Sequence, residues 1–261
     1  MKAEAAIEFD NKVVLVTGAG RGIGAAIARA FAAQGAAVGV NYLRSEDSAR
    51  QVVDDCRQAG GDAVALRADV TSGEAAAELV AQAVDEFGRI DVLVNNAFSP
   101  YTFDPDERKR FAELAWSDYQ SQFDGTVGGA FNMCQAVLPH FRQRAQGAIV
   151  NIVSNLVEQP LVPYHDYTTA KSALIGFSRN LASDLGPLGV RVNCVAPGLV
   201  YPTQGSAGSR AGFRETLAAA TPLRRIARPE DIAGPVLFLA SEWSRFMTGQ
   251  VLIVDGGLVM K

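Results

Sequence analysis

Tyr167 and Lys171 are the residues whose chemistry and spacing first suggest a reaction. They stand four positions apart, so on a helix they share one face, one turn from each other. Such a pair is common by chance, and a core tyrosine beside a surface lysine is the simplest interpretation. Three features favour a functional site: Ser154 lies 13 residues earlier at the end of a predicted strand, the pair opens a predicted helix, and a glycine-rich turn lies far upstream. A hydroxyl, a phenol and an amine brought together could exchange protons with a substrate.

The glycine-rich turn follows directly after a run of valines. Its sequence from Thr17 to Gly24 places Gly18, Gly22 and Gly24 between the first predicted strand and the first predicted helix. Glycines there let the backbone approach a pyrophosphate, and the helix N-terminus offers unpaired N–H groups and the positive end of its dipole. The spacing differs from the common G-x-G-x-x-G pattern. Its position at the first strand–helix junction still predicts a dinucleotide site.

The end of the second predicted strand indicates which dinucleotide binds. An acidic residue there would bond the adenosine ribose and select NAD, but the strand ends near Arg44 with no acid before Glu46. Arg44 and Arg21 could instead form charge-assisted bonds with a 2′-phosphate. The pattern therefore favours NADP(H). NAD remains open, because a solvated Arg44 would let either cofactor bind.

The elements that must position these residues follow from the hydrophobic pattern. Continuous Val and Ile runs are typical of strands buried on both faces of a parallel sheet, and their alternation with helices selects a doubly wound fold. The predicted strands are 13–16, 37–41, 63–66, 91–95, 148–153, 190–195 and 251–254, and the predicted helices are about 23–33, 45–59, 72–87, a longer region ending near 144, 166–185 and 229–240. With no linker and no internal repeat, we expect an α/β protein with a single Rossmann-type domain over residues 1–261, a seven-stranded parallel sheet and helices on both faces.

Composition and charge exclude several classes of protein. The chain has 261 residues, of which 48 % are hydrophobic and 20 % charged, as in an ordinary globular protein. A formal net charge of −4 and the lack of a basic run predict no nucleic-acid partner and no membrane surface. The acidic N-terminal segment does not resemble a secretion signal, so a cytoplasmic location is expected.

The cysteines and histidines do not suggest a metal site. Cys56, Cys134 and Cys194 are scattered and odd in number, and only two histidines are present, His140 and His165. Metal-binding cysteines are normally grouped at short spacings. We therefore expect three reduced, partly buried thiols and no metal.

Taken together, the motifs resemble those of the short-chain dehydrogenase/reductase family over nearly the whole chain. The matching pieces are Thr17-Gly18-x-x-x-Gly22-Ile23-Gly24, Asp69-Val70, Asn95-Asn96-Ala97, Ser154, Tyr167-x-x-x-Lys171, Pro197-Gly198 and Asp255-Gly256-Gly257. Within the family, segments 225–233 and 248–257 are most similar to the 3-oxoacyl-(acyl-carrier-protein) reductases.

The resemblance implies a role for each residue of the proposed triad. Tyr167 would be the general acid in reduction, giving its proton to a carbonyl oxygen as hydride arrives from the nicotinamide. Ser154 would hydrogen-bond that oxygen. Lys171 would bind the nicotinamide ribose, and its ammonium, together with the positive charge of the oxidised nicotinamide, would lower the pKa of the Tyr167 phenol toward the working range.

The resemblance also implies a set of cofactor contacts. Asp69 and Val70 would line the adenine pocket, Asn95 would steady the fourth strand, and the segment from Pro197 to Val200 would lie near the nicotinamide. The residues expected at the cofactor are Gly18, Arg21, Gly22, Ile23, Gly24, Asn41, Arg44, Asp69, Val70, Asn95, Ala97, Tyr167, Lys171, Pro197, Gly198 and Val200.

Two positions depart from the family pattern. Phe98 stands where the family usually has glycine, so it is either strained by a positive φ or lines a pocket. Thr126 stands 28 residues before Ser154, where the family has a fourth catalytic residue, an asparagine that anchors a water for proton resupply. The threonine hydroxyl could replace that amide only in part. If the backbone carbonyl at this position holds the water, replacing asparagine by threonine would have only a mild effect on proton resupply.

The resemblance implies NADPH-dependent reduction of a ketone, with a 3-oxoacyl thioester as the leading substrate. The first alternative is an NAD(P)-dependent dehydrogenase of a sugar, polyol or other secondary alcohol, and the second is a non-catalytic dinucleotide sensor. Substrate choice would lie in loops at about 98–110 and 200–220, where segment 203–212 is either a mobile lid or a plain surface loop.

A homotetramer across residues 107–144 and 166–185 is expected by resemblance. Arg142 and Arg144 either meet an acidic carrier protein or are simply solvated.

Overall fold

The computed structural model describes residues 8–260 and contains a seven-stranded sheet in the order β3-β2-β1-β4-β5-β6-β7. Every paired strand in it is parallel, so the predicted fold class is confirmed. The strands are β1 (Val13–Val16), β2 (Ala37–Tyr42), β3 (Asp62–Arg67), β4 (Val92–Asn95), β5 (Gly147–Ile152), β6 (Val190–Pro197) and β7 (Val251–Val254). Residues 1–7, which carry most of the acidic segment used above to argue against a secretion signal, lie outside the described residues, as does residue 261.

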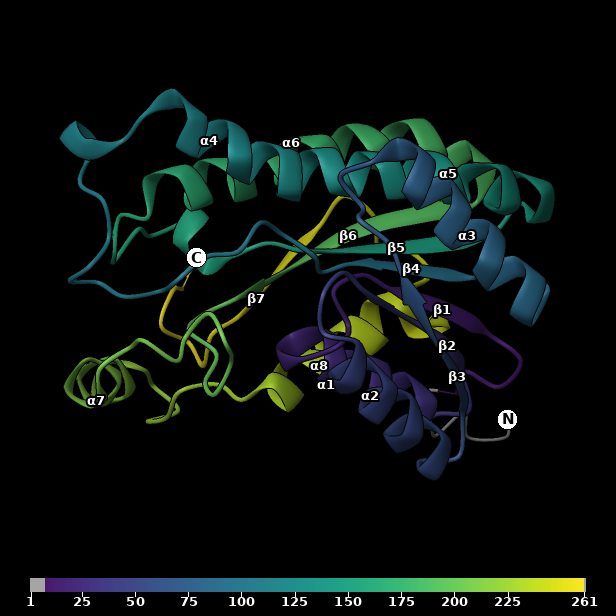
Figure 1. Ribbon diagram of the computed structural model, residues 1–261, viewed down its shortest axis with the longest axis horizontal. Helices are drawn as coiled ribbons and strands as arrows, with labels where there is room; N and C mark the ends of the chain where they lie inside the picture. Colours follow the sequence, from purple (N-terminus) through teal and green to yellow (C-terminus); the bar gives the residue numbers. More distant parts are fainter. Residues whose placement is uncertain (1–7, 261) are drawn as a thin grey trace.

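Helices cover both faces of the sheet (Figure 1). The helices are α1 (Gly22–Ala32), α2 (Glu46–Gln58), α3 (Gly73–Phe87), α4 (Trp116–Phe123), α5 (Gly129–Arg144), α6 (His165–Leu185), α7 (Ala211–Ala220) and α8 (Pro229–Ala240). Helices α1, α2 and α8 pack on one face, whereas α3, α5 and α6 pack on the other. Single 3₁₀ turns occupy Phe111–Glu113, Asn155–Val157, Gly186–Leu188 and Glu242–Ser244, and a π-helical turn, Asp124–Gly128, joins α4 to α5.

The core explains why the valine runs form strands. All four residues of β1 and all four of β4 are buried, with helices above and below them. Their side chains alternate between the two faces, so Val14 and Val16 join one apolar cluster while Leu15 joins the other. Helices begin and end at matching signals: the Ser72 hydroxyl accepts a hydrogen bond from Ala75 N–H at the start of α3, and Gly88 at φ 77° ends it.

The strand order reverses between β1 and β4. From β1 the chain continues outward to β2 and β3, whereas β4 begins the opposite series through β5, β6 and β7. At such a reversal the two connecting segments diverge and leave a crevice at the carboxyl ends of the strands. The glycine-rich turn follows β1 and the segment from Asn96 follows β4, so both meet at this crevice.

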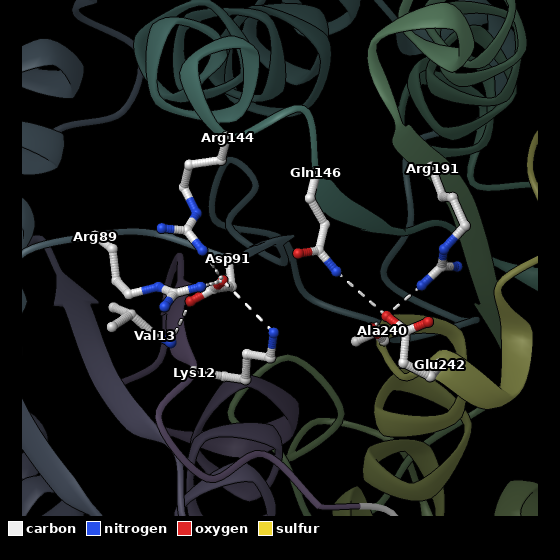
Figure 2. Close-up of polar contacts among 9 residues, drawn as sticks. All are labelled: Lys12, Val13, Arg89, Asp91, Arg144, Gln146, Arg191, Ala240 and Glu242. Atoms are coloured by element: carbon white, nitrogen blue, oxygen red, sulfur yellow. Dashed lines mark hydrogen bonds and ion pairs between the residues drawn. The ribbon is translucent and has the colours of Figure 1, made fainter.

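Charged side chains join the elements at the opposite edge, where the strands begin (Figure 2). The buried Asp91 carboxylate accepts a hydrogen bond from Val13 N–H (2.9 Å) and pairs with Arg89, Lys12 (4.0 Å) and Arg144 (3.7 Å). Arg144 therefore lies at the edge away from the crevice, where it joins α5 to β1 and β4. Arg144 is thus paired with Asp91 and is not simply solvated.

Three local features differ from the sequence expectations. Helix α7 fills half of the segment expected as a substrate loop at 200–220. The long helical region before Arg144 is interrupted by the π-helical turn. Phe98 does not have a positive φ, since the non-glycine residues with positive φ among the described ones are Asn11, Ala145 and Arg224, so the strained alternative is wrong. No helix within residues 8–260 is long and apolar enough to span a membrane.

Candidate active site

A cavity of about 800 Å³ lies at the crevice between β1 and β4. Segments that follow strands β1 to β6 all contribute to its lining, together with loop residues from 98–103 and 203–206. Fifteen of the sequence-predicted residues line it: Gly18, Arg21, Gly22, Ile23, Asn41, Arg44, Asp69, Val70, Ala97, Ser154, Tyr167, Lys171, Pro197, Gly198 and Val200.

The glycine-rich turn is held close against the end of β4. Gly18 has φ 61° and Gly22 has φ 56°, a conformation that favours glycine. A Cβ on Gly18 would lie 3.2 Å from the Cα of Ala97, so the turn has no room for a side chain. The Asn96 amide donates to the carbonyls of Thr17 (2.9 Å) and Gly18 (3.2 Å) and fixes the turn. Sequence reasoning gave Asn96 no role, because only the fold brings it to the turn.

Asn41 supports the turn from the other side. Its side-chain oxygen accepts a hydrogen bond from Gly18 N–H (3.1 Å), and its amide nitrogen donates to the carbonyls of Leu66 and Ala68, each at 3.2 Å. The side chain is buried and its hydrogen bonds are internal. Asn41 therefore positions the turn, and its side-chain hydrogen bonds are made within the protein.

One end of the cavity is cationic. Arg21 and Arg44 line it beside the exposed start of α2, and the Arg21 guanidinium donates to the Ser45 hydroxyl (3.2 Å). Asp69 lies nearby, with one carboxylate oxygen accepting from both the N–H and the hydroxyl of Thr71. The glycine turn, the N-terminus of α1 and these arginines together fit the phosphates of a dinucleotide.

Ser154, Tyr167 and Lys171 converge at the other end. Ser154 follows β5, whereas Tyr167 and Lys171 lie on the first turns of α6, and all three are buried. The Lys171 Nζ atom donates to the Ile152 carbonyl (2.8 Å) and lies 5.7 Å from the centre of the Tyr167 ring. The Ser154 hydroxyl accepts from Leu156 N–H (3.2 Å). The structure thus brings together the three groups that the sequence singled out.

Burial dominates the titration of these groups. Desolvation lowers the pKa of Lys171 to about 7, because a charged amine is disfavoured away from water. Desolvation raises the pKa of Tyr167, while hydrogen bonding to Ser154 acts in the opposite direction. In the chain by itself, burial of the phenol outweighs its hydrogen bond with Ser154. The expected lowering of the Tyr167 pKa depends also on the charge of an oxidised nicotinamide, so it stays a prediction.

Three aromatic rings pack against Tyr167, and a fourth packs against two of them. Tyr101 and Phe103 have ring centres 5.3 and 5.0 Å from that of Tyr167, and Phe98 lies 5.8 Å away. Tyr164 packs against Tyr101 (5.7 Å) and Phe103 (5.5 Å). We call Phe98, Tyr101, Phe103 and Tyr164 the aromatic wall. All four of its members line the cavity, so Phe98 follows the alternative in which it shapes a pocket.

Comparisons with known proteins agree with this geometry. The family model described as enoyl-(acyl carrier protein) reductase matches residues 18–259. An uncharacterised oxidoreductase of Methylorubrum extorquens is 43 % identical over 96 % of the chain and 99 % of the relative. A 3-oxoacyl-[acyl-carrier-protein] reductase of Staphylococcus epidermidis is 36 % identical over 96 % of the chain and all of the relative. The chain belongs to the short-chain dehydrogenase/reductase family. It is an NAD(P)-dependent oxidoreductase.

The solved structures extend the likeness to a liganded member of the short-chain dehydrogenase/reductase family. A 7α-hydroxysteroid dehydrogenase in complex with NADH and 7-oxo glycochenodeoxycholic acid matches with a TM-score of 0.89 and 33 % identity, over the whole chain and 99 % of that structure. The two folds are therefore the same throughout.

Three residues expected at the site do not line the cavity of this short-chain dehydrogenase/reductase. Gly24 is packed inside, where a Cβ would lie 2.6 Å from the Gly18 carbonyl. Asn95 donates to Asn151 (2.9 Å) and to the Cys134 sulfur (3.6 Å), so it joins β4 to β5, as its expected steadying role requires, without reaching the cofactor groove. Thr126 is buried in the π-helical turn, and its hydroxyl has no hydrogen-bond partner.

A hydrogen bond that the sequence did not reveal fixes the aromatic wall. The Tyr101 hydroxyl donates to the Asp166 carboxylate (2.8 Å), and Asp166 is the residue before Tyr167. No sequence signal pairs it with Tyr101, because the two residues lie 65 positions apart.

Proposed function

We propose that the protein reduces a ketone to a secondary alcohol with NADPH, with Tyr167 as the proton donor. The observation that supports this most directly is the arrangement of one cavity. Its cationic end carries Arg21 and Arg44, and its other end carries Ser154, Tyr167 and Lys171. A dinucleotide that spans the cavity would place its phosphates at the first end and its nicotinamide at the second.

Each residue of the triad has a distinct part in this proposal. The Ser154 hydroxyl already accepts a hydrogen bond from Leu156 N–H, which leaves its proton for the ketone oxygen. Tyr167 gives its own proton to that same oxygen. Lys171 is anchored on the Ile152 carbonyl, so its remaining N–H groups can reach a ribose hydroxyl and pass protons toward the phenol. A bound reduced nicotinamide supplies the hydride that the ketone carbon accepts.

The preference for NADP(H) belongs to the proposal as well. Arg44 and Arg21 stand at the edge of the cavity, and no acidic side chain lines that edge at the end of β2 within the described residues. Two guanidinium groups favour a 2′-phosphate over a ribose hydroxyl. The alternative, binding of NAD by the same groove, predicts equal affinities for the two dinucleotides.

Two substrate classes remain candidates. The relatives named as 3-oxoacyl-[acyl-carrier-protein] reductases favour a 3-oxoacyl thioester. The relatives named as 7α-hydroxysteroid dehydrogenases favour another secondary alcohol. The third possibility, a dinucleotide sensor without turnover, is weakened by the intact triad, because binding alone does not require three convergent proton-exchanging groups.

Absorbance of the reduced nicotinamide tests the proposal. The purified protein is mixed with NADPH or NADH and either acetoacetyl-CoA or a neutral ketone. We expect NADPH oxidation in the wild type and loss of turnover in Tyr167→Phe, with NADPH affinity near the wild-type value. Tyr119→Phe is the matched control, because Tyr119 lies on α4 and does not line the cavity. Turnover that survives Tyr167→Phe would refute the role of Tyr167, and binding without turnover would favour the sensor.

A homotetramer across residues 107–144 and 166–185 is also part of the proposal. Helices α4 and α5 expose large apolar side chains in this region, with Trp116 69 % and Phe131 48 % exposed. Exposed apolar groups of this kind are typical of an interface. Light scattering at several protein concentrations measures the assembly directly, and a monomeric mass would contradict this part of the proposal.

A further inference from the structure

The aromatic wall is built from two segments that lie far apart in the chain. Phe98, Tyr101 and Phe103 come from the segment after β4, whereas Tyr164 directly precedes α6. Their rings pack edge-to-face or tilted on one another and on Tyr167, with centres 5.0 to 6.5 Å apart. Because Tyr167 holds the reacting proton, any substrate that reaches it must lie beside these rings.

The wall is fixed in place before any ligand arrives. The Tyr101 hydroxyl is bonded to Asp166, and Phe103 N–H donates to the Gly205 carbonyl (2.8 Å), which ties the two variable loops together. A Cβ on Gly205 would lie 3.1 Å from the Phe103 ring, so the loops are in close contact there. Rings held in this way lose little conformational freedom when a ligand packs on them.

The charge of the cavity is distributed unevenly. Among the described residues that line it, four side chains are charged: Arg21, Arg44, Asp69 and Lys171. Arg21, Arg44 and Asp69 lie at the end assigned to the dinucleotide. Lys171 belongs to the triad with Ser154 and Tyr167. The cavity lining also includes the apolar Leu199, Phe213 and Leu217 and uncharged polar side chains such as Thr102 and Gln204. A carboxylate or phosphate on the substrate body would be desolvated beside the wall without a cation to pair with.

We propose that the substrate's body, the part buried beside the carbonyl group, is uncharged and carries a ring. This inference rests on the proposed function, since it assumes that a ketone is held at Ser154 and Tyr167. A flat ring can stack on, or meet edgewise, the rings of Phe103 and Tyr101, whereas a linear chain of equal carbon number makes only ordinary apolar contacts. Hydroxyl groups of a sugar that faced the rings of Phe98 and Phe103 would have no hydrogen-bond partner there.

A matched pair of neutral 3-oxo esters tests the inference. Ethyl 3-oxo-4-phenylbutanoate and ethyl 3-oxodecanoate carry the same reacting group and the same number of carbons beyond it, in one case with a ring and in the other as a linear chain. We expect kcat/KM with NADPH to be about two- to tenfold higher for the ring-bearing ester. The same ring with a para-carboxylate is expected to react at least about tenfold more slowly, because the buried charge has no partner.

Phe103→Leu should remove most of the preference for the ring, because leucine keeps the apolar bulk and the backbone bond to Gly205 but lacks the ring face. Phe246→Leu is the control, because Phe246 is fully exposed and does not line the cavity. NADPH affinity, measured in parallel, shows that each variant retains a folded site.

The outcomes separate the inference from the function on which it rests. A ring preference that is lost in Phe103→Leu and kept in Phe246→Leu supports the inference. Equal rates for the two esters, or a carboxylated ring that reacts as fast as the neutral one, overturn it and leave ketone reduction standing. Failure to oxidise NADPH with any ketone overturns the proposed function, and the inference with it.

Discussion

Replacement of Lys171 by methionine should make the protein more stable at neutral pH and below. Burial lowers the pKa of this amine from 10.5 to about 7, so at pH 6 the folded protein holds an ammonium that is largely desolvated. That change in pKa corresponds to about 5 kcal/mol of destabilisation at pH 6. Methionine removes this charge but leaves the Ile152 carbonyl without its partner, which costs about 1–3 kcal/mol. We therefore expect Lys171→Met to raise the free energy of unfolding by about 2–4 kcal/mol at pH 6.

The sign of the pH dependence follows from proton binding. Between pH 7 and 10.5 the unfolded wild type binds a proton at Lys171 that the folded state has lost, so the wild-type stability rises with pH in that window. Lys171→Met lacks this dependence. The amount by which the unfolding free energy of Lys171→Met exceeds that of the wild type should therefore fall by about 3 kcal/mol between pH 6 and pH 9. This change with pH does not depend on what the lost hydrogen bond contributes.

Urea unfolding at a fixed protein concentration, without dinucleotide, measures both quantities. Lys109→Met is the control: its ammonium is exposed and paired with Asp118, so its effect should be much the same at both pH values. A Lys171→Met effect that does not change between pH 6 and pH 9 would refute the reasoning, because it would mean that burial does not affect the charge of this amine. Turnover should be lost in the variant in either case.

Three further changes probe other parts of the molecule. Arg44→Ala should weaken NADPH binding about tenfold and leave NADH binding unchanged, as measured by fluorescence titration, because it removes a charge-assisted bond to the 2′-phosphate; an unchanged NADPH affinity would count against the preference. Asp91→Asn should lower the free energy of unfolding by about 2–3 kcal/mol in urea, since three cations lose their common counter-charge; a loss below 1 kcal/mol would show that solvent already screens them. Thr126→Val should raise the unfolding free energy by about 1 kcal/mol, because the buried hydroxyl has no partner, and a decrease would reveal an unseen bond.

The strands and the triad could be predicted because their signals are local. The valine run before Gly18 is buried on both faces, and this pattern can be read from four residues alone. Tyr167 and Lys171 share a face because the helix repeat requires it. Ser154 was a candidate because it ends a predicted strand, and the family resemblance gave it a role; no local pattern shows that the end of β5 lies beside the start of α6.

Other features depend on contacts that no local pattern records. Helix α7 is short, has no fully buried residue and follows a glycine- and serine-rich segment that favoured a loop, although its Phe213 and Leu217 line the cavity. The π-helical turn at Asp124–Gly128 lies within the long helical region, where the sequence pattern predicts a helix without indicating its type. Asn96 and Asp166 find their partners 79 and 65 positions away, at Thr17 and Tyr101.

Phe98 connects the aromatic wall to Tyr167 and Lys171. Its ring centre lies 5.8 Å from that of Tyr167 and 4.9 Å from the Lys171 Nζ atom. An aromatic face attracts an ammonium, so the ring opposes part of the desolvation that lowers the pKa of Lys171. The same ring packs against Tyr167 and lines the cavity as part of the aromatic wall. A glycine at this position could do none of these things, so one residue joins the wall proposed to hold the substrate to the lysine proposed to take part in proton transfer.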